Sequence, residues 1–251
     1  MKKQKILFFV LLAAIVLVTP GSEKLSFLAG NVKQPLTIVV DAGHGGPDGG
    51  AEAVDGTQEA DLNLAVAKAL QDEGERRGMK VIMTRETEEG LYAEDNMERK
   101  WRKLEDMECR KACIEASDAD VAVSIHMNCF REDSRVHGAQ TFYPKTGNAE
   151  VLAVSEKLAE VVQTALKNGI RDGSNRDPMG KGDVYLLENP ALPTVLVECG
   201  FLSNEADLAR LKQENWQRTI ARCILEGIRK METPHNGETE KLRIEYNREM
   251  R

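Results

Sequence analysis

The sequence predicts a single α/β domain in which a mostly parallel, twisted sheet of about six strands carries helices on both faces. Short apolar runs alternate along the chain with longer segments whose apolar residues recur every three or four positions, and this alternation is typical of a parallel sheet covered by helices. A chain of 251 residues with 41% hydrophobic residues suits one core and is too short for two ordinary catalytic domains. No repeat of 20 to 50 residues is present, so a solenoid is excluded.

The first half of the domain is expected to contain three strands and two helices. The expected strands are residues 36–40, 79–84 and 120–125, and the expected helices are residues 61–77 and 98–117. In the first helix, Leu62, Val66 and Leu70 fall on one face, which should pack on the sheet. A glycine-dense loop from Gly43 to Gly50 follows the first strand, and its small residues allow the backbone to approach a ligand closely.

The second half is expected to add three strands, two helices and one long loop. The expected strands are residues 140–143, 184–187 and 194–198, the helices are residues 150–167 and 216–228, and the polar segment 169–182 is expected to be a surface loop.

The two ends of the chain differ from the domain in composition. Residues 1–21 carry three early lysines and then thirteen uncharged residues, so we expect a signal peptide or an N-terminal membrane anchor, and hence an exported protein. Whether the segment is cleaved stays open, as does the alternative of a buried N-terminal strand or helix. Residues 22–35 are expected to be a linker, residues 36–231 the catalytic domain, and residues 232–251 a charged flexible tail.

Charge and cysteine content exclude two classes of protein. The net charge of -7 and the pI of about 5.3 argue against nucleic acid as a partner, because phosphate binding relies on a basic face. The five cysteines are an odd set without a second pair to match Cys109 and Cys113, so neither a disulfide framework nor a cysteine zinc site is expected. We expect buried, inert thiols.

Two histidines and two glutamates form a candidate metal site. His44, His126 and Glu198 each stand at the end of an apolar run, and Glu59 opens an amphipathic helix. The carboxyl ends of parallel strands meet at one edge of a sheet, so these side chains are expected to converge. His44, Glu59 and His126 would supply the three protein ligands of a catalytic zinc, with one position left for water.

The fourth residue of this set is expected to move protons. Glu198 follows a buried run, where desolvation raises the pKa of a carboxyl toward the range of a general base. Taken singly, Glu59 could be a helix-dipole partner and His126 a core histidine. His137 and His235 are expected to lie at the surface and in the tail, and Asn128, Arg85 and the glycine loop are candidate substrate contacts.

Several motifs carry a resemblance to a known family. They are VDAGHGGPDGGA, EADLNLAVAKAL, Thr84-Arg85, ADVAVSIHMN and PTVLVECGFLSN. Together, over residues 36–230, they resemble the zinc-dependent N-acetylmuramoyl-L-alanine amidases of the type 3 family. The resemblance implies one Zn²⁺ per chain held by His44, Glu59 and His126, and a catalytic Glu198. The implied substrate is peptidoglycan, glycan strands with peptide stems, cut between the lactyl group of N-acetylmuramic acid and L-alanine. Ala60 replaces a common lysine of the family.

The short form of the chain, without a wall-binding module, is similar to the sporulation and germination members of that family. This similarity implies a role in forming muramic-δ-lactam in spore cortex, on the outer face of a membrane or in the cortex region. An accessory activator protein at the membrane is kept as a candidate partner. The alternatives are a zinc carboxypeptidase-like stem-peptide hydrolase, which would grip a terminal carboxylate through Arg85 or Arg176, and a non-catalytic peptidoglycan-binding module or membrane-tethered scaffold.

Overall fold

The structure is a computed structural model that describes residues 35–92 and 99–232. The predicted signal segment 1–21, all but the last residue of the predicted linker, and all but the first residue of the predicted tail lie outside these ranges, as does His235. No helix within the described ranges has the length and apolar character needed to cross a membrane.

Six strands form one sheet in the order β2-β1-β3-β6-β4-β5. Their bounds are β1 Thr37–Ala42, β2 Lys80–Met83, β3 Val121–Asn128, β4 Gln140–Pro144, β5 Met179–Lys181 and β6 Thr194–Phe201. β1 pairs in parallel with β2 and β3, and β3 pairs in parallel with β6. β4 runs antiparallel to β6, and β5 runs parallel to β4. The predicted class, a mostly parallel sheet of about six strands, is therefore confirmed.

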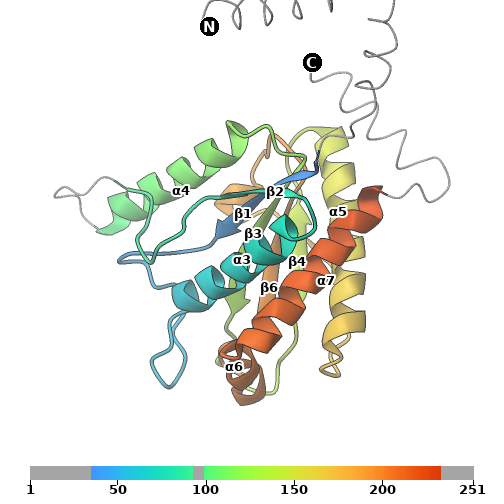
Figure 1. The fold of residues 1–251 in the computed structure, drawn as a ribbon. Coiled ribbons are helices and arrows are strands. Elements are labelled where there is room, and N and C mark those ends of the chain that lie inside the picture. Colours follow the sequence, from blue (N-terminus) through green and yellow to red (C-terminus); the bar gives the residue numbers. More distant parts are fainter. Residues whose placement is uncertain (1–34, 93–98, 233–251) are drawn as a thin grey trace, which may run out of the picture. The chain divides into compact units, whose positions relative to one another are not determined.

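Helices cover both faces of this sheet. The helices are α3 Glu59–Glu75, α4 Arg99–Glu115, α5 Ala149–Ile170, α6 Glu205–Leu211 and α7 Glu214–Glu232, with a 3-10 turn η1 at Tyr185–Leu187. Figure 1 shows α3, α7 and α5 side by side on one face, where their apolar residues form the main core with the sheet. The other face packs a smaller apolar cluster that joins Val39 and Ala122 to Ile114 of α4 and Leu186 of η1.

The central strands are buried on both sides, which explains their composition. Every residue of β6 is buried, and only the first residue of β1 is not. A strand with helices on both faces has no solvent side, so its sequence reads as a continuous apolar run instead of an alternating one. The charged exceptions in these strands, Asp41 and Glu198, are therefore the residues whose burial needs a separate explanation.

Three expectations from the sequence are wrong. Residues 184–187 were expected to form a strand, but Tyr185–Leu187 is a 3-10 turn that buries Leu186 and Leu187, and a short apolar run does not distinguish the two structures. The expected loop 169–182 contains the edge strand β5, whose sequence MGK has no periodicity to reveal it. Cys109 is exposed, whereas the thiols of Cys199 and Cys223 are buried as expected. Helix α6 was not predicted.

Candidate active site

Three neighbouring parallel strands bring the candidate residues to one edge of the sheet. Ala42, the last residue of β1, pairs with Ile125 of β3, and His44 follows two positions later. His126 pairs directly with Glu198 across β3 and β6, so these two side chains lie beside each other on the sheet face covered by α4. Glu59 is the first residue of α3, on the loop side of the same edge.

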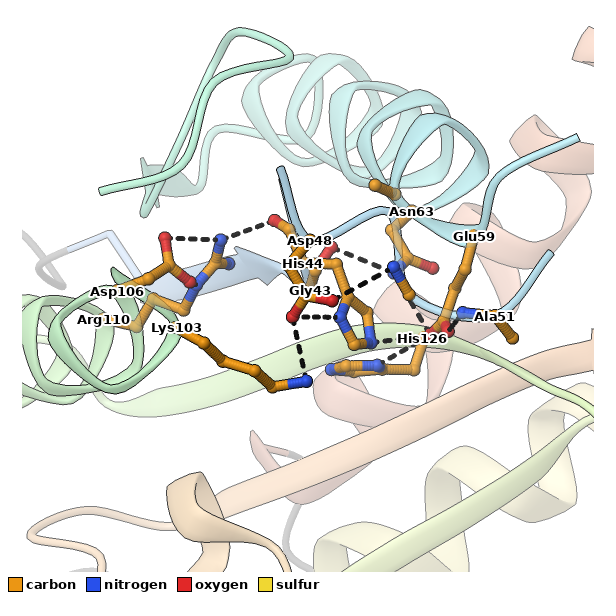
Figure 2. Close-up of polar contacts among 12 residues, drawn as sticks. Gly43, His44, Asp48, Ala51, Glu59, Asn63, Lys103, Asp106, Arg110 and His126 are labelled. Atoms are coloured by element: carbon orange, nitrogen blue, oxygen red, sulfur yellow. Dashed lines mark hydrogen bonds and ion pairs between the residues drawn. The ribbon is translucent and has the colours of Figure 1, made fainter. Parts of the chain in front are cut away.

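His44, Glu59 and His126 converge on one point (Figure 2). Their nearest ligand atoms all lie within 4.8 Å of one another. The Oε1 atom of Glu59 is 2.9 Å from Nδ1 of His126 and 3.3 Å from Nε2 of His44, and the two imidazole rings meet edge to face with centroids 5.0 Å apart. Two imidazole nitrogens and a carboxylate oxygen are a donor set that suits a catalytic zinc ion.

The backbone around His44 is shaped to admit this convergence. His44 has a φ of 60°, in the left-handed region that a residue with a side chain rarely adopts, and such a conformation costs on the order of 1–3 kcal/mol. Gly43 lies against the ring of His126, and a Cβ atom there would overlap that imidazole. A glycine is therefore required at this position by the close approach of β3 to the loop.

Two of the three ligand residues, His44 and Glu59, have further partners that orient them. Nδ1 of His44 lies 3.0 Å from Oδ2 of Asp48, which is in turn 3.0 Å from Nζ of Lys103. The carboxylate of Glu59 accepts hydrogen bonds from the backbone N–H groups of Ala51 and Met127 at 2.9 and 3.2 Å. Carboxylate partners of this kind hold metal-binding imidazoles in one tautomer and one orientation.

Sequence reasoning missed Asp48 and a second residue, Asn63. The amide of Asn63 donates to the carbonyl of Gly43 at 3.0 Å and to Glu59 at 3.4 Å, and Asn63 is fully buried. Two signals were available. Asn63 stands four residues after Glu59, on the same helix face, and Asp48 is the acidic residue four positions after His44.

The electrostatics of the ligand group favour a bound cation. Burial tends to raise the pKa of Glu59, but the hydrogen bonds and charges of His126 and His44 outweigh it and hold that pKa well below its usual range. Burial tends to lower the pKa of His44, but its hydrogen bonds to Asp48 and Glu59 raise it to about 9. Positive charge is therefore stabilised at this point, either as protons or as a metal ion in their place.

Glu198 lies beside this group and is in a different environment. It is buried, and its Oε2 atom has no hydrogen-bond partner among the described residues. Burial raises the pKa of this carboxyl, and the negative charge of Glu59 adds to the rise, while the nearby cations oppose it. A buried carboxylate oxygen without a partner is costly unless a water molecule or a substrate atom binds it.

The candidate substrate contacts have unequal support. Arg85 is 3% exposed, and its guanidinium donates to the backbone carbonyls of Ala42, Gly43, Ala60 and Thr87 at 2.7–3.0 Å. These contacts support a role in holding the glycine loop and do not favour substrate binding. The side chain of Asn128 is partly exposed at the end of β3, and its Oδ1 accepts from the backbone N–H of Cys129.

Two other residues considered from the sequence have contacts outside the ligand group. Arg176 donates to the carbonyl of His137 and stacks on the ring of Phe201 at 4.6 Å. His137 itself contacts the carbonyl of Arg135. Neither Arg176 nor His137 belongs to the group formed by the two histidines and Glu59.

Known proteins share both the sequence pattern and the fold. A family model described as N-acetylmuramoyl-L-alanine amidase matches residues 38–230. The chain is 36% identical over 192 residues to the germination-specific N-acetylmuramoyl-L-alanine amidase of Bacillus subtilis, which covers 76% of this chain and 77% of that protein.

Solved structures agree with this match. The CwlD amidase from Clostridioides difficile, solved in complex with the GerS lipoprotein, is 42% identical with a TM-score of 0.73, over 78% of this chain and 97% of that one. An N-acetylmuramoyl-L-alanine amidase from Clostridium difficile 630 is 25% identical with a TM-score of 0.66, over 81% and 100%. With a family match over most of its length, this chain belongs to the N-acetylmuramoyl-L-alanine amidase family.

Proposed function

We propose that this amidase depends on one Zn²⁺ per chain, held by His44, Glu59 and His126, with Glu198 as its general base. One observation carries the proposal: three ligand atoms lie within 4.8 Å of one another, and a buried carboxyl group is paired in register with one of the ligands. The three ligands would leave a position for water, as catalytic zinc sites do.

The residues divide the chemistry between two carboxylates. When bound, zinc would polarise the amide carbonyl and lower the pKa of water from about 15.7 to about 7. Glu198 takes a proton from the water that attacks the lactyl carbonyl carbon, and then gives a proton to the amine of L-alanine as the C–N bond breaks. Its raised pKa suits both transfers. Glu59, whose pKa is lowered, stays ionised as a ligand throughout.

The proposed bond is the amide between the lactyl group of N-acetylmuramic acid and L-alanine in peptidoglycan. The family description supports this substrate. Asn128 is proposed as a substrate contact, because its partly exposed side chain follows His126 by two residues at an irregularity in the pairing of β3 and β6. The family description does not favour the carboxypeptidase-like alternative, and the two arginines that it would use, Arg85 and Arg176, both donate to backbone carbonyls.

The biological setting is proposed from the named relatives. The Bacillus subtilis relative is a germination-specific amidase, and the Clostridioides difficile relative binds a lipoprotein. We propose that this chain is exported through residues 1–21, acts through a catalytic domain at residues 36–231, and removes stems so that muramic-δ-lactam forms in spore cortex. A membrane lipoprotein is the proposed accessory partner. Cortex from a strain lacking this chain should then contain no muramic-δ-lactam.

Mass spectrometry of digested peptidoglycan tests the proposed activity. The full chain, stripped of metal by a chelator, should release nothing, and added Zn²⁺ should restore the release of stems that begin with a free L-alanine amine. Release of single terminal amino acids would instead identify a stem-peptide hydrolase. Equal stem release with and without the chelator would reject zinc dependence.

A further inference from the structure

A residue outside the ligand group contacts the loop that carries His44. Arg110 lies on α4, 2% exposed, and Figure 2 shows its guanidinium reaching toward this loop. Its Nη2 atom donates to the backbone carbonyl of His44 at 2.5 Å, and its Nη1 atom donates to the carbonyl of Ala42 at 2.5 Å. Within the described ranges, no other hydrogen bond to the His44 carbonyl is present.

The loop that carries His44 needs such a contact, because the backbone conformation of His44 is energetically unfavourable by itself. His44 has a positive φ, and Gly45 and Gly46 after it also have positive φ values. A ligand in a left-handed conformation persists only where surrounding contacts determine it. Arg110 and Arg85 together bind the carbonyls of three successive residues, and only Arg110 reaches the one that belongs to the ligand itself.

Arg110 is held firmly on its other side. Its Nε atom donates to Oδ2 of Asp106 at 2.5 Å, and Nη1 also donates to Oδ1 of Asp41 at 2.8 Å. Asp41 in turn accepts from Thr84 at 2.7 Å and from Ser124 at 2.5 Å. The planar fork of an arginine can bind two carboxylates and two carbonyls at fixed angles, which the single ammonium of a lysine cannot do.

We propose that Arg110 is a positioning residue for the metal centre, which fixes the backbone of His44 so that its imidazole meets the other two ligands. The residue acts through His44 and does not touch the metal or the substrate. This inference rests on the proposed function, because it assumes that the ligand group binds zinc.

Metal titration of the full chain carrying Arg110→Lys tests the inference. Lysine keeps the positive charge beside Asp41 but loses the fork. Competition with a chromophoric chelator should show a zinc dissociation constant about 10–100-fold higher than in the wild type, the usual effect of losing a group that orients a ligand. The visible absorption of the Co²⁺-substituted protein should also change, because it reports ligand geometry.

Thr84→Val is the matched control. It removes one hydrogen bond to the same buried Asp41 without touching residues 42–44, so zinc affinity and the Co²⁺ spectrum should stay as in the wild type. Asp106→Asn is a second variant that keeps Arg110 and weakens its anchor, and it should raise the zinc dissociation constant less than Arg110→Lys does.

The outcomes separate the two proposals. Wild-type zinc affinity and an unchanged Co²⁺ spectrum in a folded Arg110→Lys variant would overturn the positioning role and leave the zinc site standing. If Arg110→Lys fails to fold, wild-type zinc affinity and an unchanged Co²⁺ spectrum in Asp106→Asn would overturn the positioning role. A wild-type chain that binds neither metal would reject the proposed function itself.

Discussion

The two faces of the sheet are built from the same strands but by different chemistry. The face under α3, α5 and α7 is an apolar core, whereas the face under α4 carries buried charge at its carboxyl end and a smaller apolar cluster elsewhere. Successive residues of a strand point to opposite faces, so one short segment contributes to both. The comparison teaches that the face under α3, α5 and α7 chiefly stabilises the fold. The face under α4 holds buried polar groups in a reactive geometry that is costly by itself and depends on that stability.

Alternation along β1 and β3 makes the contrast concrete. Val40 and Val123 belong to the apolar core. The next residues, Asp41 and Ser124, pair with each other in register on the opposite face and share a hydrogen bond of 2.5 Å. Asp41 and Arg110 form a buried ion pair, and the cost of removing both charges from water can offset their attraction. Removing only one of the two partners is destabilising, because it leaves a buried charge uncompensated.

The largest expected effect is on catalysis at the polar face. Glu198→Gln removes the proton acceptor and keeps the shape of the side chain, so the hydrolysis rate should fall by about 10²–10⁴-fold. Zinc content and thermal unfolding should change little. The matched control is Glu188→Gln, the same substitution at an exposed residue, which should retain full activity. A Glu198→Gln variant that releases stems at the wild-type rate would remove Glu198 from the mechanism.

Arg110→Met tests how much the stability of the sheet face under α4 depends on the ion pair between Asp41 and Arg110. The substitution leaves Asp41 buried without its charge partner, and the free energy of unfolding should fall by about 3–5 kcal/mol in urea titrations at neutral pH. Arg222→Met is the comparison, because Arg222 is half-exposed and Glu73 keeps other arginine partners. Its cost should be below about 1 kcal/mol. Equal costs for the two variants would contradict the contrast drawn between the faces.

At acid pH, the difference in the free energy of unfolding between Arg110→Met and the wild type should become smaller. In the wild type, burial tends to raise the pKa of Asp41, but Arg110 and the hydroxyls of Ser124 and Thr84 lower it below its usual value. That carboxylate therefore contributes stability above the unfolded-state pKa of about 3.9, which is lost as the pH falls through the lowered pKa. Without Arg110, the buried carboxyl of Asp41 is expected to have a raised pKa. Protonation at acid pH then removes the uncompensated charge and restores part of the variant's free energy of unfolding. Unfolding titrations between neutral pH and about pH 4 that show a constant difference would contradict this account.

The smallest effect is expected in the apolar core. Ile224 on α7 is fully buried, and Ile224→Val removes one methylene group, which should lower the free energy of unfolding by about 1 kcal/mol. Zinc affinity and stem release should be unchanged, since this residue faces away from the site. A loss of activity larger than the loss of stability would show that the two faces are more tightly coupled than their contacts indicate.

Much of the fold and of the candidate site was accessible from the sequence. Apolar runs located β1, β3 and β6, and apolar spacing located α3, α5 and α7 to within a few residues. Polar residues at the ends of those runs singled out His44, His126 and Glu198, because parallel strands end at a common edge. Arg85 was singled out as a substrate contact, yet its buried contacts with carbonyls could not be read from the chain.

The sequence by itself determined the class of fold, the order of its longer elements and the residues able to bind a metal, because local periodicity and residue chemistry are properties of short segments. It did not reveal β5, η1 or α6. Only the tertiary structure decided what supports those residues. Asp41 and Arg110 are 69 positions apart in the chain and meet only when α4 docks on the sheet. Burial raises the pKa of Glu198, whereas charged and hydrogen-bonding partners lower the pKa values of Asp41 and Glu59, and both burial and partners depend on every neighbouring element at once.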